Sequence, residues 1–500
     1  MYPKYYETQK ALPLQSYLFG HRVQPSQTKY EYLIEFLQVA IAKKENANTA
    51  RQYDATDMFP VDNDQLNGNI SYRPETRIGL KRFVFLPKSK LDGKAKVDQL
   101  AYNDCIRALE GQVSGDNRIK KQNSITIVQN LMNGFSAVNQ SRSWFDQNML
   151  PICPEVILPE GMGVKKWRQS LDYQLGDPDV DYKFDYHRYT YMCRGGEVYY
   201  LHLLNAINQF PQYKNPIQTR LREMITSFPQ FSYLCNFVEQ TWENRIAILD
   251  GDKPHVDKKL GVIPDSFSRR NEYTLRELSN FLNSKSHPFE KMETLANGII
   301  LQLLRAMYNA ASTDSDSNCW VIDVNCSELK NIEAKKAAIA GFMKNEEIIN
   351  NYLYSGLEVY RDVLAASDDS KIIKDAADDS YRLFRKMGKM IGIVIPNTGK
   401  GMRFTLSEDI VKFLVLAIIP PKKMITLDEF IELLYLHYGM VIGPKQYKVE
   451  MEKECVKPVG DFSFLEENKK AFAQKLKDCG FLRDLSDATS IVENPYEQEA

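Results

Sequence analysis

The residues that could carry out chemistry are few and stand far apart in the chain. Asp323 lies inside the apolar stretch Trp320 to Val324, which predicts a strand, and carboxylates on a sheet edge bind the metal in nuclease cores. Such a core needs a second carboxylate and a lysine at strand spacing, but Glu328 and Lys330 fall beyond the strand. A metal-dependent nuclease that uses Asp323 is therefore an alternative hypothesis and not the leading one.

Phosphate-loop and zinc patterns are also incomplete. Gly399-Lys400 is preceded by Gly392, two positions too early for a phosphate loop, and no serine or threonine follows the lysine. Cys319 and Cys326 have no neighbouring histidine or cysteine that would complete a zinc site. The 6 histidines are scattered, and none pairs recognisably with a serine or cysteine nucleophile. The sequence therefore predicts that the protein is not an enzyme and uses no cofactor or metal.

The C-terminal region has the clearest pattern of elements. Helices are expected over 407–419, 426–439 and 463–480, the second and third opened by the capping boxes Thr426/Glu429 and Ser463/Glu466. A polar connection separates the last two helices, and short strands are expected at 481–485 and 490–492. Three helices followed by a strand pair are the order of elements in a winged helix, which is a binding module.

The third of these helices is basic. The residues that could contact DNA phosphates are Lys469, Lys470, Lys475, Lys477 and Arg483. Glu466, Glu467 and Asp478 dilute this charge, so a solvated helix face is the simpler interpretation. Winged helices also serve as protein-docking modules, and docking or domain packing is favoured here over the recognition of DNA bases.

A second candidate contact region lies between Leu171 and Tyr200, where tyrosines alternate with basic residues. The residues proposed for an interface are Tyr186, Arg188, Tyr189, Tyr191 and Arg194. Such a mixture could stack on bases, but tyrosines that pack against a partner protein or domain are the favoured interpretation. Gly195-Gly196 is expected to form a turn before a helix over 198–208.

The composition bounds the class of protein. The chain has 500 residues, of which 43% are hydrophobic and 26% charged, and its formal net charge is −1, so bulk polyanion binding is not expected. The 8 cysteines form no C-x-x-C pair and resemble reduced core thiols, which points to the cytoplasm. No apolar window has the length of a membrane span, and the N-terminus has no apolar core typical of a secretion signal.

The expected fold is mainly α (α+β), a multi-domain helical protein with a C-terminal winged-helix domain. The predicted divisions are a mixed, mainly helical domain over 1–150, a Tyr/Pro/Gly-rich connection and interface segment over 151–215, a helical middle domain over 216–385 and a winged-helix-like domain over 386–500. Other expected helices cover 28–42 with a Thr28/Glu31 capping box, 97–110, 124–135, 218–228, 231–248, 274–282 with a Thr274/Glu277 capping box, 289–311, and one or two between 329 and 365. Strands are expected at 82–86 and 318–326, with a hairpin from 389–395 and 402–405 and a mobile loop over 111–122.

Three segments carry a resemblance to known proteins. They are Tyr17-Leu-Phe-Gly-His-Arg22 running into the helix over 30–37, Met192-Cys-Arg-Gly-Gly-Glu-Val-Tyr-Tyr-Leu201, and Gly480-Phe-Leu-Arg-Asp-Leu-Ser-Asp487 ending at Asn494-Pro495. Together they resemble uncharacterised proteins of bacterial multi-gene anti-phage or restriction loci, which stand beside ATPases or helicases. The resemblance covers about a tenth of the chain and transfers no site residue. It implies an accessory subunit of an assembly whose motor or nuclease is another chain.

The leading hypothesis is therefore a non-catalytic accessory or scaffold subunit of a bacterial defence complex. It would bridge an ATPase, helicase or nuclease subunit from the same operon, and its winged helix is a candidate site for double-stranded DNA. A kleisin-like clasp subunit of a chromosome-maintenance-type ATPase is a variant of this hypothesis, in which the winged helix docks on the ATPase. The competing class is the nuclease that uses Asp323.

Overall fold

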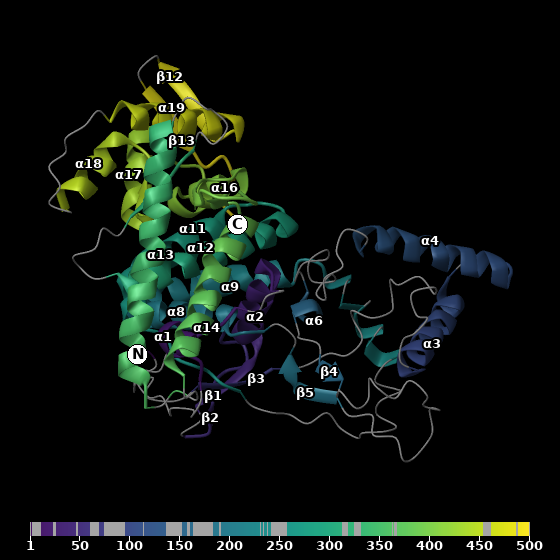
Figure 1. Ribbon diagram of the computed structural model, residues 1–500. Coiled ribbons are helices and arrows are strands. Elements are labelled where there is room, and N and C mark those ends of the chain that lie inside the picture. Colours follow the sequence, from purple (N-terminus) through teal and green to yellow (C-terminus); the bar gives the residue numbers. More distant parts are fainter. Residues whose placement is uncertain are drawn as a thin grey trace.

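The structure is a computed structural model, and its helices dominate the fold (Figure 1). It describes residues 2, 12–23, 27–46, 49–60, 70–74, 96–113, 115–136, 153–157, 161–163, 184–189, 192–230, 232–233, 235–237, 239–241, 258–312, 319–324, 332–362, 364, 368–453, 462–486 and 489–499. The prediction of a mainly helical protein is confirmed, since the sheets are small. Among the described helices, none combines the length and the apolar character that crossing a membrane would require.

Helix α12 (Pro288–Ala311) is the centre of the hydrophobic core. Nearly all of its side chains from Lys291 to Ala311 are buried, because α2 (Lys29–Ile41), α13 (Ile332–Tyr360) and α16 (Glu408–Ile418) pack against it (Figure 1). Helix α11 (Asn271–Asn283) packs on α16. A helix that is apolar on most of its surface is stable only when it is covered on all sides. The core therefore joins segments that are far apart in the sequence.

Helices α2 and α8 (Gly195–Gln209) pack against each other at unusually close range. A Cβ atom on Gly196 would lie 2.3 Å from the backbone oxygen of Tyr32, and one on Gly195 would lie 2.0 Å from the Tyr32 ring. The buried carboxylate of Glu35 accepts hydrogen bonds from the backbone N–H groups of Arg194 (3.0 Å) and Gly196 (2.8 Å), so α2 caps the N-terminus of α8. The double glycine thus belongs to the helix and not to a preceding turn.

The C-terminal elements assemble around a small antiparallel sheet. After α16 come β10 (Met424–Thr426), α17 (Leu427–Tyr438), β11 (Met440–Val441), α18 (Pro444–Lys453), α19 (Ser463–Asp478), β12 (Leu482–Ser486) and β13 (Thr489–Glu493). Strand β13 lies between β10 and β12 and is antiparallel to both. Residues 406–499, which we call the C-terminal module, occupy one end of the molecule, and the last residues return to α11 and α12, where Glu499 pairs with Lys291 at 2.6 Å.

The module is tied to the rest of the protein by a two-stranded parallel sheet. Strand β7 (Trp320–Val321) pairs with β11, and Trp320 is fully buried and stacks on Phe404 with ring centroids 4.5 Å apart. The buried amide of Asn468 on α19 donates to the backbone oxygens of Ile322 and Ile442, each at 2.9 Å. Asn468 therefore fixes α19 to both strands by satisfying buried backbone acceptors.

The remaining elements surround this frame. The helices are α1 (Leu14–Phe19), α3 (Lys96–Gln112), α4 (Arg118–Ser136), α6 (Pro154–Ile157), η2 (Pro211–Tyr213), α9 (Lys214–Ile225), η3 (Asp265–Arg270), α14 (Asp369–Tyr381), η4 (Arg382–Met387) and α15 (Gly388–Met390). The strands are β1 (Lys43–Asn46), β2 (Arg51–Gln52), β3 (Ile70–Arg73), β4 (Gly161–Gly163), β5 (Phe184–Tyr189), β6 (Lys258–Lys259), β8 (Val394–Ile395) and β9 (Arg403–Phe404), with sheet orders β2-β1-β3-β6, β4-β5 and β8-β9. Helices α3 and α4 contact each other in a pair that lies apart from α12 (Figure 1).

Two of the four predicted capping boxes mark real helix starts. Both halves of the Thr28/Glu31 capping box are present, Ser407 caps α16, and Thr426 caps α17, which ends at Gly439 with a positive φ of 63°. The helices expected over 97–110, 218–228 and 289–311 and the C-terminal strand pair are also confirmed within a few residues.

Several local predictions were wrong. Thr274 and Glu277 form no capping box, because α11 begins earlier, at Asn271, and both residues are buried inside it. Ser463 is the first residue of α19 and not its N-cap, which is Phe462. Residues 389–390 are helical, so the hairpin is shorter than expected, and the strand at 318–326 is reduced to β7 among its described residues.

Two predicted connections contain regular structure. The loop expected over 111–122 is mostly helical, since α3 extends to Gln112 and α4 begins at Arg118, and the polar connection before α19 contains β11 and α18. The strand expected at 82–86 and part of the helix expected at 231–248 lie outside the described residues.

Candidate functional site

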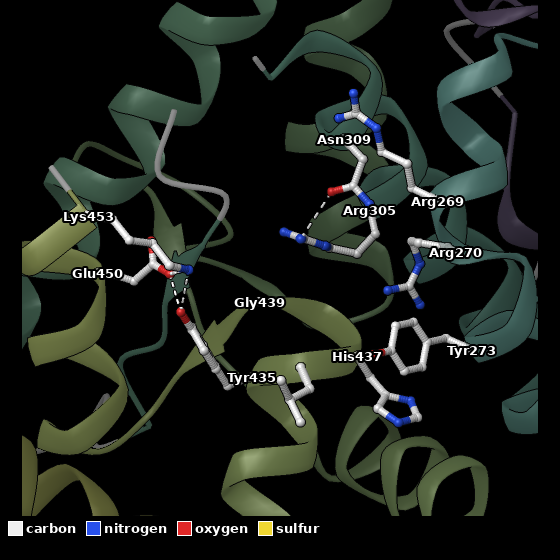
Figure 2. A pocket seen from close by; sticks show the side chains of 11 residues that line it. Arg269, Arg270, Tyr273, Arg305, Asn309, Tyr435, His437, Gly439, Glu450 and Lys453 are labelled. Carbon is white, nitrogen blue, oxygen red and sulfur yellow. Dashed lines mark hydrogen bonds and ion pairs between the residues drawn. The ribbon is translucent and has the colours of Figure 1, made fainter. Parts of the chain in front are cut away.

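A basic pocket of about 260 Å³ lies between the helical core and the C-terminal module. In Figure 2, one wall carries Arg269, Arg270 and Arg305, and the opposite wall carries Tyr435, Glu450 and Lys453. The first wall comes from η3 and α12, and the second from α17 and α18. Gly439 lies between the walls, at the point where α17 ends and β11 begins.

Arg270 is held at the base of the pocket by a buried polar network. Its Nη2 lies 3.3 Å from both carboxylate oxygens of Glu277 and donates to Oε1 of Gln302 at 3.1 Å. The Oε2 atom of Glu277 accepts from the hydroxyl of Tyr438 at 2.7 Å, and its Oε1 lies 2.7 Å from Nδ1 of His437. Burial raises the pKa of Glu277. The charge of Arg270 and these hydrogen bonds together lower it by more, so the pKa lies below its ordinary value.

Arg305 is buried beside this network, with 2% of its surface exposed. Its guanidinium lies over the ring of Trp320, 4.7 Å from the centroid, and its Nη2 donates to Oδ1 of Asn309 at 3.2 Å. Burial and then the charge of Arg270 lower the pKa of Arg305 to about 9. The second of these two effects means that the charges of Arg270 and Arg305 repel each other.

The opposite wall contains a hydrogen-bonded triad. The buried carboxylate of Glu450 accepts from the hydroxyl of Tyr435, and Nζ of Lys453 lies 2.9 Å from the same carboxylate oxygen and 2.8 Å from the tyrosine hydroxyl. Burial lowers the pKa of Lys453, but its bonds to Tyr435 and Glu450 raise it well above the ordinary value. Lys453 therefore stays charged at the rim, where 58% of its side chain is exposed.

The chemistry that this arrangement allows is the binding of an anion. Basic side chains outnumber carboxylates in the pocket, even when Glu277 behind Arg270 is counted. Arginine forks bind phosphate and carboxylate groups through paired N–H donors. Among the described residues that line the pocket, none is a serine, threonine or cysteine, which leaves it without the usual nucleophiles.

The predicted DNA-contacting residues lie on α19 and β12, and each has a partner within the chain. Lys469 pairs with Asp428, Lys470 with Glu467 at 2.8 Å, Lys477 with Asp484 at 2.8 Å, and Arg483 with Glu493. Lys475 donates to the backbone oxygen of Leu406. The structure thus brings these residues together on one module but surrounds them with carboxylates.

Asp323, the residue proposed for a nuclease site, is a buried ion-pair partner. Its Oδ2 accepts from Nε of Arg403 at 2.6 Å, and the hydroxyl of Thr405 donates to its backbone oxygen at 2.8 Å. Within the described part of the chain, no three His, Cys, Asp or Glu side chains are grouped as metal ligands. These contacts favour a structural role for Asp323.

The predicted tyrosine-rich interface is only partly described. Tyr186, Arg188 and Tyr189 lie in β5, and Tyr191 lies outside the described residues. Arg194 precedes α8 with a φ of 70°, and its Nη2 donates to Oε1 of Glu197 at 2.6 Å. The same carboxylate oxygen accepts from the backbone N–H of Gly261 at 2.7 Å, so Arg194 takes part in a contact inside the protein.

The pocket residues were missed by sequence reasoning. Their contacts cross long sequence separations, such as the 160 positions between Glu277 and His437, and no local pattern reports such a contact. One signal was available. Arg305 stands at a buried position of a mostly apolar helix, and a buried charge is costly unless it is paired.

Comparison of the chain with known protein families and with curated proteins finds no match.

Proposed function

We propose that this protein is a non-catalytic accessory subunit of a bacterial anti-phage or restriction complex, and that its C-terminal module is a winged helix that docks on a protein partner. The partner is an ATPase, helicase or nuclease subunit encoded in the same operon. The observation that carries the proposal is the arrangement of the C-terminal sheet and its three main helices.

The order of the elements supports this assignment. Helix α16, strand β10 and helices α17 and α19 precede the strand pair β12 and β13, and β13 lies between β10 and β12. A winged helix has the same succession of helix, strand, two helices and two strands joined by the wing. Here β11 and α18 are inserted between the second and third helices.

The charges and exposed apolar groups of the module favour a protein partner over DNA. The candidate DNA-contacting lysines of α19 are paired with groups of the same chain, which reduces the counterion release that drives DNA binding. Met424 on β10 and Leu485 on β12 are 57% and 65% exposed, at the two outer strands of the sheet. Apolar side chains that are exposed in this way become buried when a protein partner covers the surface that carries them.

Double-stranded DNA is the second candidate ligand of the module. The observation in its favour is that Lys470 and Lys477 keep 72% and 55% of their side chains exposed on α19, in spite of their ion pairs. Exposed ion pairs contribute little free energy, so a phosphate could replace the carboxylates.

The test is co-expression with the operon neighbours, followed by affinity purification and size-exclusion chromatography. We expect an ATPase, helicase or nuclease subunit to co-elute, and we expect the double variant Met424→Glu/Leu485→Glu to lose it. The control is Ile119→Glu on α4, where an apolar side chain of similar exposure lies outside the module. Retention of the partner by the double variant, or equal loss with the control, would contradict docking through the module.

The other candidate functions give different results. Duplex binding at low salt that weakens in Lys470→Gln and Lys477→Gln would favour the DNA hypothesis. Co-elution with a chromosome-maintenance-type ATPase would support the clasp variant. Magnesium-dependent DNA cleavage by the isolated protein would overturn the non-catalytic assignment.

A further inference from the structure

The basic pocket is not used by the proposed docking surface, and its construction differs from that of an ordinary surface ion-pair cluster. We propose that it is a binding site for a small phosphate-bearing molecule, with the phosphate held between Arg270 and Arg305 and the remainder of the ligand directed toward Tyr273. The proposal does not depend on which partner the C-terminal module binds.

The first argument is the burial of the cations. Arg270 and Arg305 are 4% and 2% exposed, although each carries a charge that is costly to remove from water. Exposed Arg269 and half-exposed Lys453 continue the positive charge from these two groups toward the solvent. A gradient of this kind attracts an anion and then places it against the less solvated guanidinium groups.

The second argument is the available donor of Arg270. Its Nη2 is engaged with Glu277 and Gln302, but its Nε has no hydrogen-bond partner among the described residues. A buried donor left in this way is costly, and an anion beside the guanidinium would offset part of this cost electrostatically. An anion would also offset the repulsion between Arg270 and Arg305.

The third argument concerns the size and the lining of the pocket. A volume of about 260 Å³ corresponds to roughly nine water molecules at their volume in the liquid, which is more than a bare phosphate needs. Tyr273 lies at the base of the pocket, and its ring centroid is 4.4 Å from that of His437. The two rings are tilted by 46°, so the partly exposed ring of Tyr273 alone offers a surface for a sugar or base, and a mononucleotide is the best-fitting member of the class.

The position of the pocket gives such a ligand a structural consequence. Arg270 and Arg305 belong to the helical core, whereas Tyr435 and Lys453 belong to the C-terminal module. A ligand that contacts both walls stabilises their present arrangement, because it binds the folded state in which the two walls face each other.

The experiment is calorimetric titration of the full-length protein with AMP and with inorganic phosphate, at constant ionic strength with chloride as the balancing anion. We expect saturable binding of AMP and weaker binding of phosphate, and a rise in the thermal midpoint with AMP. The variants Arg269→Ala and Lys453→Ala lie at the rim and should fold. Each should weaken AMP binding by about tenfold, the effect of losing one charged hydrogen bond.

Two further variants make the outcome decisive. Arg305→Lys keeps the charge but removes the fork of N–H donors. It should therefore weaken the binding of AMP more than it lowers the thermal midpoint of the ligand-free protein. Arg276→Gln removes an exposed arginine of α11 that pairs with Glu272 outside the pocket, and it should leave AMP binding unchanged. Absence of saturable AMP and phosphate binding, or an equal loss in Arg276→Gln and Arg269→Ala, would overturn the proposal.

These results are independent of the docking experiment. Loss of the partner in Met424→Glu/Leu485→Glu with normal AMP binding would support both proposals, and failure of either experiment leaves the other interpretable. Phosphate binding as tight as that of AMP would contradict the role given to Tyr273.

Discussion

Arg403 donates a hydrogen bond from Nε to Oδ2 of Asp323 across 2.6 Å, and 8% and 2% of the two side chains are exposed. The pair joins the segment after β7 to β9, beside the stacked rings of Trp320 and Phe404. A buried pair of this kind does not necessarily add stability, but the loss of one member leaves an uncompensated charge. The two residues therefore depend on each other.

Breaking this pair should destabilise the protein strongly. We expect Asp323→Ala and Arg403→Met each to cost about 3–5 kcal/mol in the free energy of unfolding, and the double variant to cost less than the sum. Urea unfolding measures this. The exposed pair Arg361–Asp369 is the control, since Arg361→Gln should change stability by about 1 kcal/mol at most. An unchanged stability in Asp323→Ala would indicate that the fold does not need this carboxylate, as the nuclease hypothesis requires of a metal-binding group.

Lys44 should make stability depend on pH in the neutral to alkaline range. Its ammonium is buried and donates to the backbone oxygens of Ala40 (2.8 Å) and Ala42 (3.0 Å), and burial lowers its pKa to about 7. Below pH 7 both states carry the charge, so the folded state bears the full cost of burying it. Above pH 7 the folded chain has lost the proton that the unfolded chain keeps, so this cost declines and the stability rises with pH.

The variant Lys44→Met tests this linkage. It should be more stable than the wild type by about 2 kcal/mol below pH 7, and the difference should decrease at higher pH. Thermal midpoints over a pH series provide the measurement. A difference that is the same at every pH would show that Lys44 does not titrate in this range.

The contrast between local and distant contacts explains what the sequence could predict. Thr28 and Thr426 were identified as caps because their partners lie within three residues, where spacing alone determines the contact. Glu277 matched the same pattern beside Thr274, but its partners are Arg270, His437 and Tyr438, and the gain from that buried network exceeds the gain from a cap.

The pocket could not be predicted for the same reason. Its residues come from η3, α12, α17 and α18, and α18 itself was assigned to a polar connection because it has little apolar periodicity. Short strands such as β10 were missed because only their pairing with β13 defines them. Long apolar helices such as α12 were predicted well, since burial on all sides leaves a clear sequence pattern.

Two buried histidines should make the protein sensitive to acid. Burial lowers the pKa of His21 to about 4 and that of His202 to about 3. As the pH falls below the ordinary histidine value, the unfolded chain binds protons that the folded chain does not, so stability decreases toward pH 4. We expect His202→Gln to reduce this slope in thermal midpoints measured against pH. Exposed His287 is the control, and an equal effect of His287→Gln would contradict the assignment.

Gly196 should be the least replaceable glycine at the contact between α2 and α8. A Cβ atom there would lie 2.3 Å from the oxygen of Tyr32 and 2.4 Å from the nitrogen of Phe36, and both are backbone atoms that move only with the whole helix. Separation of the helices would also lengthen the hydrogen bond from the Gly196 N–H to Glu35. We expect Gly196→Ala to cost about 1–3 kcal/mol or more in urea unfolding, the range for overpacked cores.

Gly111 provides the matched control for this substitution. It also lies in a helix, but no atom is within 4 Å of its added Cβ, so Gly111→Ala should stabilise α3 by about 0.5–1 kcal/mol through helix propensity alone. Opposite signs for the two alanine variants would establish that the double glycine permits close helix packing. Stabilisation of both variants would contradict this packing, because α2 and α8 would then lie farther apart than the contacts of Gly196 with Tyr32 and Phe36 indicate. The capping of α8 by Glu35 would then need another explanation.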